Sequence, residues 1–384
     1  MRFDFATAAR ILFAPGGVSD LPRIALEFGS KPLVVTGRNS ARVAPVLNAF
    51  RRAKLDALTF PVEGEPTLDT VRTGARVARQ QQRDLLIGLG GGSVIDAAKA
   101  IAAVTTNSGE PLDYLEVIGK GRALESPPLP FIAVPTTAGT GAEVTRNAVL
   151  GSPEHGVKAS LRSPAMLAKV ALVDSELTLE LPPNITAATG LDTLTQLIEP
   201  FVSSRANAFT DLFCIEGMHC VRTSLIQAVA NGSNRVARES MSFASLLSGL
   251  SLANAGLGVI HGFAAPLGGM LNAPHGALCA AVLPYGVLKN VQAMRRRSPS
   301  HDGLRRYAEA ARILTGDAHA DAEDLSGWLA DLVRRLEIPT LAQHGLTRIQ
   351  IPLLVEKAAA ASSMKSNPIA LTPEELTEVA ERAL

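Results

Sequence analysis

The sequence predicts two domains, an α/β domain with a parallel sheet over residues 1–183 and an all-helical domain over residues 184–384. Three observations predict this division. Short apolar runs alternate with helical patterns in the first half, a glycine cluster follows one of these runs, and only Ala- and Leu-rich helical patterns follow Leu181-Pro182-Pro183. A chain of 384 residues is also too long for one ordinary core.

Five runs in the first half are interpreted as strands with helical patterns between them, and the runs 84–89, 131–134 and 170–173 are interpreted as buried. Continuous apolar strands that alternate with helices predict a parallel sheet covered on both faces. Thr67 is placed to cap one of the helices through its hydroxyl group. The predicted strands are 33–36, 57–62, 84–89, 131–134 and 170–173, and the predicted helices include 41–54, 68–82 and one beginning near Val94.

Charge and composition exclude several classes of partner. Lys and Arg number 37 against 36 Asp and Glu, so neither a nucleic-acid-binding nor a membrane-binding surface is predicted. Three cysteines are too few for a disulfide framework. No signal peptide opens the chain, and no apolar run reaches the ~18–20 residues of a membrane span. We therefore expect a cytoplasmic protein.

A glycine cluster, Gly90-Gly91-Gly92-Ser93, lies where the strand 84–89 gives way to a helix. Glycines let the backbone approach a ligand, and a helix N-terminus offers unpaired N–H groups to a pyrophosphate. A simple tight turn is the alternative for the cluster by itself. Asp96 and Lys99 on the same helix, and the glycine- and hydroxyl-rich segment 135–144 after the next strand, favour a Rossmann-like nucleotide site.

As a set, these motifs resemble the iron-containing (group III) alcohol dehydrogenases, which are related in fold to glycerol dehydrogenase and dehydroquinate synthase. The resemblance covers nearly the whole chain and includes the glycine motif, Pro135-Thr136-Thr137, Lys158 with Ser163-Pro164, Val173-Asp174 with Leu177, and Ser366-Asn367-Pro368. It implies a dehydroquinate synthase-like architecture with the active site between the two domains, and a homodimer. It also implies NAD(P) lying across Gly91, Gly92, Ser93, Thr136, Thr137, Thr140 and Lys158, with Asp96 at the nicotinamide end.

The choice between NAD and NADP depends on the segment after the strand 33–36. NAD-preferring members of the family commonly carry an Asp where this chain has Gly37. That carboxylate would bind the ribose hydroxyls and repel a 2′-phosphate. Gly37-Arg38-Asn39-Ser40 instead offers a bare backbone, a cation and a hydroxyl, which favours acceptance of NADP. Arg38 as a plain surface residue, with use of both cofactors, is the alternative.

A metal site is predicted in the helical domain. Asp192, His261 and His275 match the family's metal-binding contexts, and one carboxylate with two imidazoles is typical of Fe(II) or Zn(II) sites. The chain departs from the family at Gln196, where most metal-dependent members have a His four residues after the aspartate. We expect Gln196 to be a weaker fourth ligand that lowers metal affinity, or water to take that place.

Two further positions near the predicted site need an interpretation. Many members carry another His four residues after the first metal-binding histidine, where this chain has Ala265. A histidine that could relay the alcohol proton is therefore missing, and no replacement is assigned. Cys279 falls one helical turn beyond His275 and could approach the metal, but a small buried apolar role is the preferred interpretation.

The predicted function is metal-dependent hydride transfer between NAD(P)(H) and a small alcohol or aldehyde. Three alternatives share parts of this pattern. The first is a metal-independent reductase of the maleylacetate reductase kind, to which the missing histidine points but which retention of Asp192 opposes. The second is a dehydroquinate synthase-type lyase, which would need a cluster of Lys, Arg and Asn residues around its substrate. The predicted helix 184–203 offers only Arg205, just past its end. The third is a nucleotide-binding protein without catalytic activity.

Overall fold

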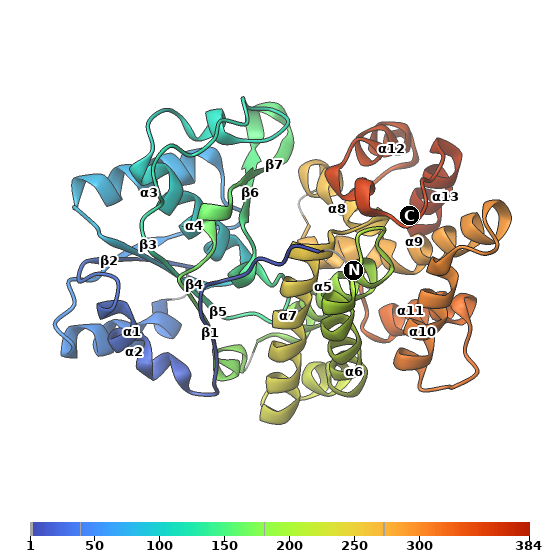
Figure 1. Cartoon of the computed structure of the whole chain (residues 1–384), viewed down its shortest axis with the longest axis horizontal. Helices are drawn as coiled ribbons and strands as arrows, with labels where there is room; N and C mark the ends of the chain where they lie inside the picture. The colour runs from blue at the N-terminus through green and yellow to red at the C-terminus, as the bar shows by residue number, and fades with distance from the viewer. Residues whose placement is uncertain (1–2, 39, 180, 272) are drawn as a thin grey trace. The chain divides into compact units, whose positions relative to one another are not determined.

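The computed structural model describes residues 3–38, 40–179, 181–271 and 273–384, which divide into two compact units (Figure 1). An α/β unit holds residues 6–137 and 141–178. A helical unit holds the chain from Leu179 onward together with the short segments 3–5 and 138–140. The contacts thus divide the chain at 178/179, whereas the predicted boundary falls at the first residue of helix α5 (Pro183–Val202).

The α/β unit is built on a six-stranded parallel sheet in the order β1-β8-β5-β4-β2-β3. Its strands are β1 (Ile11–Phe13), β2 (Pro32–Thr36), β3 (Leu58–Pro61), β4 (Leu85–Gly90), β5 (Phe131–Pro135) and β8 (Val170–Val173). Each of the five predicted strands is present within one residue at both ends. The strands β2, β4, β5 and β8 are buried at every position, which confirms the interpretation of their apolar runs.

Helices cover both faces of this sheet, as predicted (Figure 1). Successive residues of β4 show the two faces, since side chains alternate along a strand. Ile87 packs in a core with residues of α1 (Leu21–Leu26) and α2 (Ser40–Arg52). Gly88 faces α4 (Gly92–Thr106), where a Cβ on this glycine would lie 3.1 Å from the Cβ of Ala98. Helix α3 (Leu68–Gln80) packs beside α4 and begins with the predicted Thr67 cap.

Three strands were not predicted. Strand β1 has only three residues, which is too short for a periodicity argument. Strands β6 (Asn147–Ser152) and β7 (Val157–Arg162) form an antiparallel hairpin outside the main sheet. Buried and partly exposed positions alternate along β6, so its pattern differs from the continuous apolar runs on which the prediction relied.

The helical unit contains no strand among the residues that the structure describes, as predicted. Helix α5 is buried along most of its length because its neighbours approach closely. A Cβ on Gly190 would lie 2.2 Å from Leu225 Cδ1, and one on Gly217 would lie 2.4 Å from Leu197 Cδ2. The other helices are α6 (Ala208–Ala230), α7 (Arg235–Ala255), α8 (Val259–Met270), α9 (His275–Arg297), α10 (Asp302–Thr315), α11 (Ala322–Arg335), α12 (Ile351–Ala359) and α13 (Pro373–Ala383).

Within the described part of the chain, no single helix has the length and hydropathy of a membrane span. One bent pair, α7 with α8, passes that test together by length and composition, with an angle of 99° between its helices.

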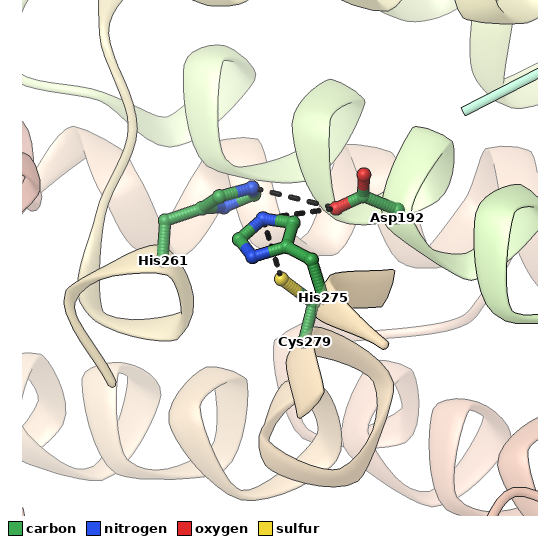
Figure 2. A group of neighbouring side chains, drawn as sticks. All are labelled: Asp192, His261, His275 and Cys279. Carbon is green, nitrogen blue, oxygen red and sulfur yellow. Dashed lines mark hydrogen bonds and ion pairs between the residues drawn. The ribbon is translucent and has the colours of Figure 1, made fainter. Parts of the chain in front are cut away.

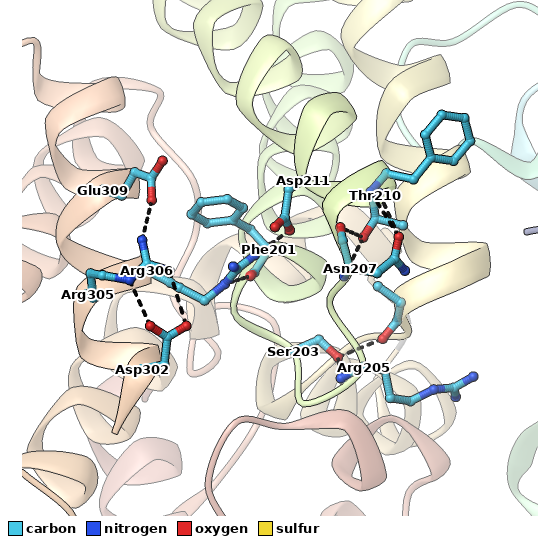
Figure 3. A network of polar contacts seen from close by, with 12 residues as sticks. Phe201, Ser203, Arg205, Asn207, Thr210, Asp211, Asp302, Arg305, Arg306 and Glu309 are labelled. Atoms are coloured by element: carbon cyan, nitrogen blue, oxygen red, sulfur yellow. Dashed lines mark hydrogen bonds and ion pairs between the residues drawn. The ribbon is translucent and has the colours of Figure 1, made fainter. Parts of the chain in front are cut away.

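Arg306 fixes the C-terminal end of α5 (Figure 3). Its guanidinium donates hydrogen bonds to the backbone oxygen of Phe201 and to the Asp211 carboxylate. The same group lies over the Phe201 ring, 4.3 Å from the centroid. A last-turn carbonyl of a helix has no intrahelical donor, and this contact supplies one. Helices α5, α6 and α10 are thereby held together at the end of the helix that carries Asp192.

Candidate functional site

Four side chains from three helices of the helical unit gather around one point (Figure 2). Asp192 comes from the middle of α5, His261 from the first turn of α8, and His275 with Cys279 from the start of α9. One ligand atom of each residue lies within 4.8 Å of those of the other three. Three of the four predicted metal ligands are therefore brought together, and Cys279 joins them.

The distances and the burial of this group fit a metal ion. Asp192 Oδ1 lies 3.5 Å from His261 Nε2 and 3.8 Å from His275 Nε2. Among the described residues, neither Asp192 Oδ1 nor His261 Nε2 has a hydrogen-bond partner, although both atoms are buried. Buried polar atoms without partners are costly in free energy. A cation bound between them would remove that cost, and a carboxylate with imidazoles is a donor set that divalent transition metals accept.

Glu199 orients the first of the two histidines. Its Oε2 accepts a hydrogen bond from His261 Nδ1 at 2.6 Å, and its Oε1 accepts one from the Ile260 backbone N–H at 2.6 Å. Because the carboxylate accepts a hydrogen bond from Nδ1–H and so keeps the proton on that nitrogen, Nε2 of His261 is left as the lone-pair atom that faces Asp192. Gly258 permits this contact, since a Cβ there would lie 3.0 Å from Glu199 Oε1.

We expect Glu199→Ala to lower metal affinity by about 10–100-fold, the range typical for loss of an outer-shell partner of a metal ligand. The substitution frees the His261 ring and leaves the buried Ile260 N–H without an acceptor. Chelator competition on the purified variant measures the affinity. Glu216→Ala, at an exposed position on α6, is the matched control and should bind metal as the wild type does. Unchanged affinity in a folded Glu199→Ala protein would contradict the positioning role.

Gln196 takes a different position from the one expected of a ligand. Its Nε2 donates a hydrogen bond to Asp192 Oδ2 at 2.9 Å, and its Oε1 accepts one from Ser248 Oγ at 3.0 Å. Both polar ends of the amide are thus engaged, and the side chain is buried. Gln196 thus holds one oxygen of Asp192, which leaves the other oxygen for the cluster, and its role as a fourth metal ligand stays a prediction.

His275 is the first residue of helix α9, and Gly276 allows that helix to approach α5. A Cβ on Gly276 would lie 2.4 Å from the Ala188 backbone oxygen and 3.2 Å from Asp192 Cβ. No larger residue fits at such distances without a shift of the backbone. The His-Gly pair in the sequence is thus explained by close packing beside the carboxylate.

The electrostatics of this pocket favour a positive charge. The nearby Cys279 sulfur and the Asp192 carboxylate raise the pKa of His275 to about 9 against the effect of burial. Burial opposes the charged form of His261 as well, but Cys279, Glu199 and Asp192 raise its pKa well above the ordinary value. Burial disfavours the Asp192 carboxylate, yet the two histidines hold its pKa below the ordinary value. A pocket that stabilises protons on two histidines also suits a divalent cation.

Ala265, where many members of the resembled family carry a further histidine, is exposed on α8.

The predicted phosphate cradle lies at the carboxyl edge of the sheet in the α/β unit. Strand β4 ends at Gly90, and α4 begins at Gly92 with Gly91 as a cap that has no side chain. The neighbouring strand β5 brings Thr137 close, since a Cβ on Gly91 would lie 3.4 Å from its side chain. The first N–H groups of a helix have no intrahelical acceptor, so this open edge fits a pyrophosphate.

Lys99 ties the segment after β5 to helix α4. It is buried, and its Nζ donates hydrogen bonds to the Ala142 oxygen, Thr145 Oγ1 and the Asn147 oxygen at 2.7–2.9 Å. Burial lowers its pKa. Asp96 lies 3.6 Å from this ammonium group and accepts a hydrogen bond from the Val149 N–H at 3.0 Å. Burial raises the pKa of Asp96. Both residues therefore position the hairpin, and the role of Asp96 at the nicotinamide stays a prediction.

The remaining predicted cofactor residues lie in both units. Lys158 is on β7, with Nζ 3.5 Å from Glu65 Oε2. Thr136 follows β5, and its N–H donates to the Gly90 oxygen at 2.9 Å. Thr140 belongs to the segment that groups with the helical unit. The contacts of Lys158, Thr140 and Ser93 with a dinucleotide stay predictions.

The segment after β2 carries a paired cation. Among the described residues, a Cβ on Gly37 would meet no atom within 4 Å, so they leave room for a side chain here. Arg38 is exposed and forms an ion pair with Glu63, which follows the neighbouring strand β3. The hydrogen bond from Arg38 holds the pKa of Glu63 below its ordinary value. Asn39 and the side chain of Ser40 lie outside the described residues.

Three residues around these sites were not predicted to act there. Cys279 is four residues after His275 and Glu199 is seven residues after Asp192, and both spacings place side chains on one helix face. The spacing of Cys279 was noted but an apolar role was preferred, whereas the spacing of Glu199 was not tested for a donor and would have found that residue. Glu63 gives no such signal, because its approach to Arg38 depends on the pairing of β2 with β3.

Two sequence profiles of one enzyme family together match nearly the whole chain. The sequence profile described as "Iron-containing alcohol dehydrogenase" matches residues 8–175, and that described as "Fe-containing alcohol dehydrogenase family, C-terminal" matches residues 186–384. The chain is 34% identical to a 1,3-propanediol dehydrogenase of Citrobacter freundii, with 99% of this chain and 98% of that protein covered. A crystal structure of a 1,3-propanediol oxidoreductase is similar with a TM-score of 0.91 and 32% identity, covering 100% of both chains. The sulfoacetaldehyde reductase of Bifidobacterium kashiwanohense in complex with NAD+ has a TM-score of 0.86 and 29% identity, covering 99% of this chain and 98% of that one.

Proposed function

Because the chain belongs to the iron-containing alcohol dehydrogenase family, we propose that it transfers hydride between NAD(P)(H) and a small alcohol or aldehyde. The observation that carries the proposal is the group of Asp192, His261 and His275, with its two buried atoms that lack hydrogen-bond partners. The metal-independent alternative is not favoured, because these residues fit a metal. The lyase alternative is not favoured, because the relatives are named dehydrogenases and reductases.

The residues of the chain supply binding and orientation. Asp192, His261 and His275 would hold a divalent metal. Gln196 fixes the side chain of Asp192, and Glu199 fixes that of His261. The backbone around Gly91 and Gly92 would hold the pyrophosphate. When bound, the metal polarises the carbonyl oxygen or lowers the pKa of the alcohol, and the nicotinamide accepts or donates the hydride. Burial of Asp192 and His261 keeps their ligand atoms away from bulk water, whereas the side chain of His275 is partly exposed.

We propose a short substrate that carries a second polar group. The named relatives include 1,3-propanediol dehydrogenases and sulfoacetaldehyde reductases, and both names describe short, polar compounds. A homodimer and a cytoplasmic location remain proposals from the family resemblance and the composition.

Turnover of a panel of alcohols and aldehydes, with metal content measured on the same sample, tests the proposed function. We expect oxidation of short primary alcohols with NAD(P), reduction of the corresponding aldehydes with NAD(P)H, and activity that follows metal content. A protein that binds metal and dinucleotide but turns over no member of the panel in either direction would contradict the proposal.

We also propose that NADP(H) is accepted. The support is the absence of a carboxylate at Gly37 and the open space around it. Arg38 is a cation within the same segment, although its pairing with Glu63 offsets part of its charge. Both cofactors can therefore be used. The ratio of NADP(H) to NAD(H) use depends on Glu63, because its pairing reduces the positive charge that Arg38 offers to a 2′-phosphate.

Gly37→Asp should shift the enzyme toward NAD. The new carboxylate would enter open space and repel a 2′-phosphate, so kcat/KM for NADPH should fall relative to NADH by at least about tenfold, or ~1.4 kcal/mol. Glu63→Gln should change the ratio the opposite way, because it frees the Arg38 cation. Steady-state kinetics with both cofactors measures the ratios. Wild-type activity with NADH alone would show that this interpretation of the segment is wrong.

A further inference from the structure

We propose that the Cys279 sulfur is a protein ligand of the metal and takes the place that a histidine at position 196 fills in most metal-dependent relatives. The ion would then be held by one carboxylate, two imidazoles and one thiolate. The inference rests on the metal site of the proposed function and adds a ligand to it. It also replaces the preferred sequence interpretation of Cys279 as a small buried apolar residue.

The first support is the separation of the ligand atoms. Cys279 Sγ lies 3.6 Å from His275 Nε2. Zn–S and Zn–N bonds of about 2.3 Å and 2.0–2.1 Å in a tetrahedral site place sulfur and nitrogen about 3.6 Å apart. The two contacts of Asp192 Oδ1 with histidine nitrogens, 3.5 and 3.8 Å, are only slightly longer than the ~3.3 Å that the same geometry gives for oxygen and nitrogen.

A second, independent support is the set of atoms without partners. Asp192 Oδ1 and His261 Nε2 are buried, belong to the same group as the cysteine sulfur, and lack hydrogen-bond partners among the described residues. They are the atoms that a cation at the centre of the group would bind. Figure 2 shows that one nitrogen of His275, Nε2, faces both the Asp192 carboxylate and the Cys279 sulfur.

A third support is that Gln196 is engaged elsewhere. Its amide bridges Asp192 Oδ2 and Ser248 Oγ, so neither polar end is free to face the cluster. Cys279 lies one helical turn after His275 on α9, which directs both side chains to the same face. With Cys279 in place of a histidine at position 196, the site keeps four protein ligands. The substrate would take a fifth position, because zinc can expand to five-coordination.

The presence of a thiolate changes which metal the site prefers. Soft sulfur ligands favour zinc over harder ions such as Mg(II) and Mn(II). We therefore expect the purified enzyme to select zinc when these ions compete at equal concentration.

Cobalt substitution tests the ligand directly. Wild-type protein loaded with Co(II) should show an intense thiolate-to-cobalt charge-transfer band in the near ultraviolet. Cys279→Ser, which preserves size, and Cys279→Ala, which preserves apolar character, should both lose the band. Both should also bind zinc at least about 100-fold more weakly in chelator competition, beyond the range for an outer-shell partner. Cys220→Ser on α6, outside the metal-binding group, is the matched control and should keep the band and the affinity.

Three results would overturn the proposal. The first is cobalt-loaded wild type without the band, and the second is a Cys279→Ser protein that keeps it. The third is a folded Cys279→Ala protein with wild-type zinc affinity. In each case the metal still binds, so the proposed function survives. Failure of the wild type to bind either metal, or full activity without metal, would contradict both the proposed metal-dependent function and the role of Cys279 as a ligand.

Discussion

His261→Ala and His275→Ala should each release the metal and lower kcat/KM by at least about 10³-fold, because loss of a Lewis acid removes several kcal/mol of transition-state stabilisation. Each imidazole supplies a nitrogen within 4 Å of Asp192 Oδ1. The two variants should behave alike although the rings come from different helices, α8 and α9. Elemental analysis alongside turnover on the same sample makes the measurement.

His219→Ala is the matched control, because His219 is exposed on α6 and belongs to no ligand group among the described residues. It should keep both metal and activity. Chelator treatment of the wild type should reproduce the loss in the two variants, and added Zn(II) or Fe(II) should restore activity only in the wild type. Full activity in a metal-free sample would move the protein to the metal-independent reductase class.

The fold could largely be predicted because its main signals are local. Four strands of the sheet, β2, β4, β5 and β8, are buried at every position, and burial on both faces of a parallel sheet requires apolar runs. Thr67 caps α3 through a hydrogen bond between residues three apart, so the sequence contains the whole interaction. The hairpin β6–β7 was missed because β6 alternates in burial and the hairpin lies outside the main sheet, where tertiary contacts such as those of Lys99 fix its position.

The metal site could be predicted only in part, because a ligand is defined by where its atoms point. Asp192, His261 and His275 were assigned correctly to one cluster through family contexts. Gln196 shares a helix face with Asp192, which is all that a spacing of four residues establishes. Whether its amide faces the cluster or the carboxylate depends on Ser248, a residue 52 positions away. Cys279, whose sulfur lies in the same cluster, was given an apolar role because a buried cysteine is usually apolar filling.

Gly92→Val should abolish dinucleotide binding while the fold survives. Gly92 is the first residue of α4, directly after the Gly91 cap, where the N–H groups lack intrahelical acceptors. A branched side chain there would hold a pyrophosphate away from those N–H groups. Loss of two charge-assisted hydrogen bonds at about 1.5–3 kcal/mol each lowers NAD(P)H affinity by at least about 100-fold. Because Val costs a helix less than about 1 kcal/mol, the secondary structure should persist.

Gly91→Ala gives a second, milder test of the same cradle. A Cβ at this position would lie 3.4 Å from the Thr137 side chain, an ordinary contact, so the methyl group fits the protein and obstructs only the ligand. Gly327→Val is the matched control, since this glycine lies on α11 and a Cβ there would meet no atom within 4 Å. Calorimetry with NADH and NADPH should show affinity falling from wild type through Gly91→Ala to Gly92→Val, and no change in Gly327→Val. Equal affinity in a folded Gly92→Val protein would show that the dinucleotide binds away from the β4–α4 turn.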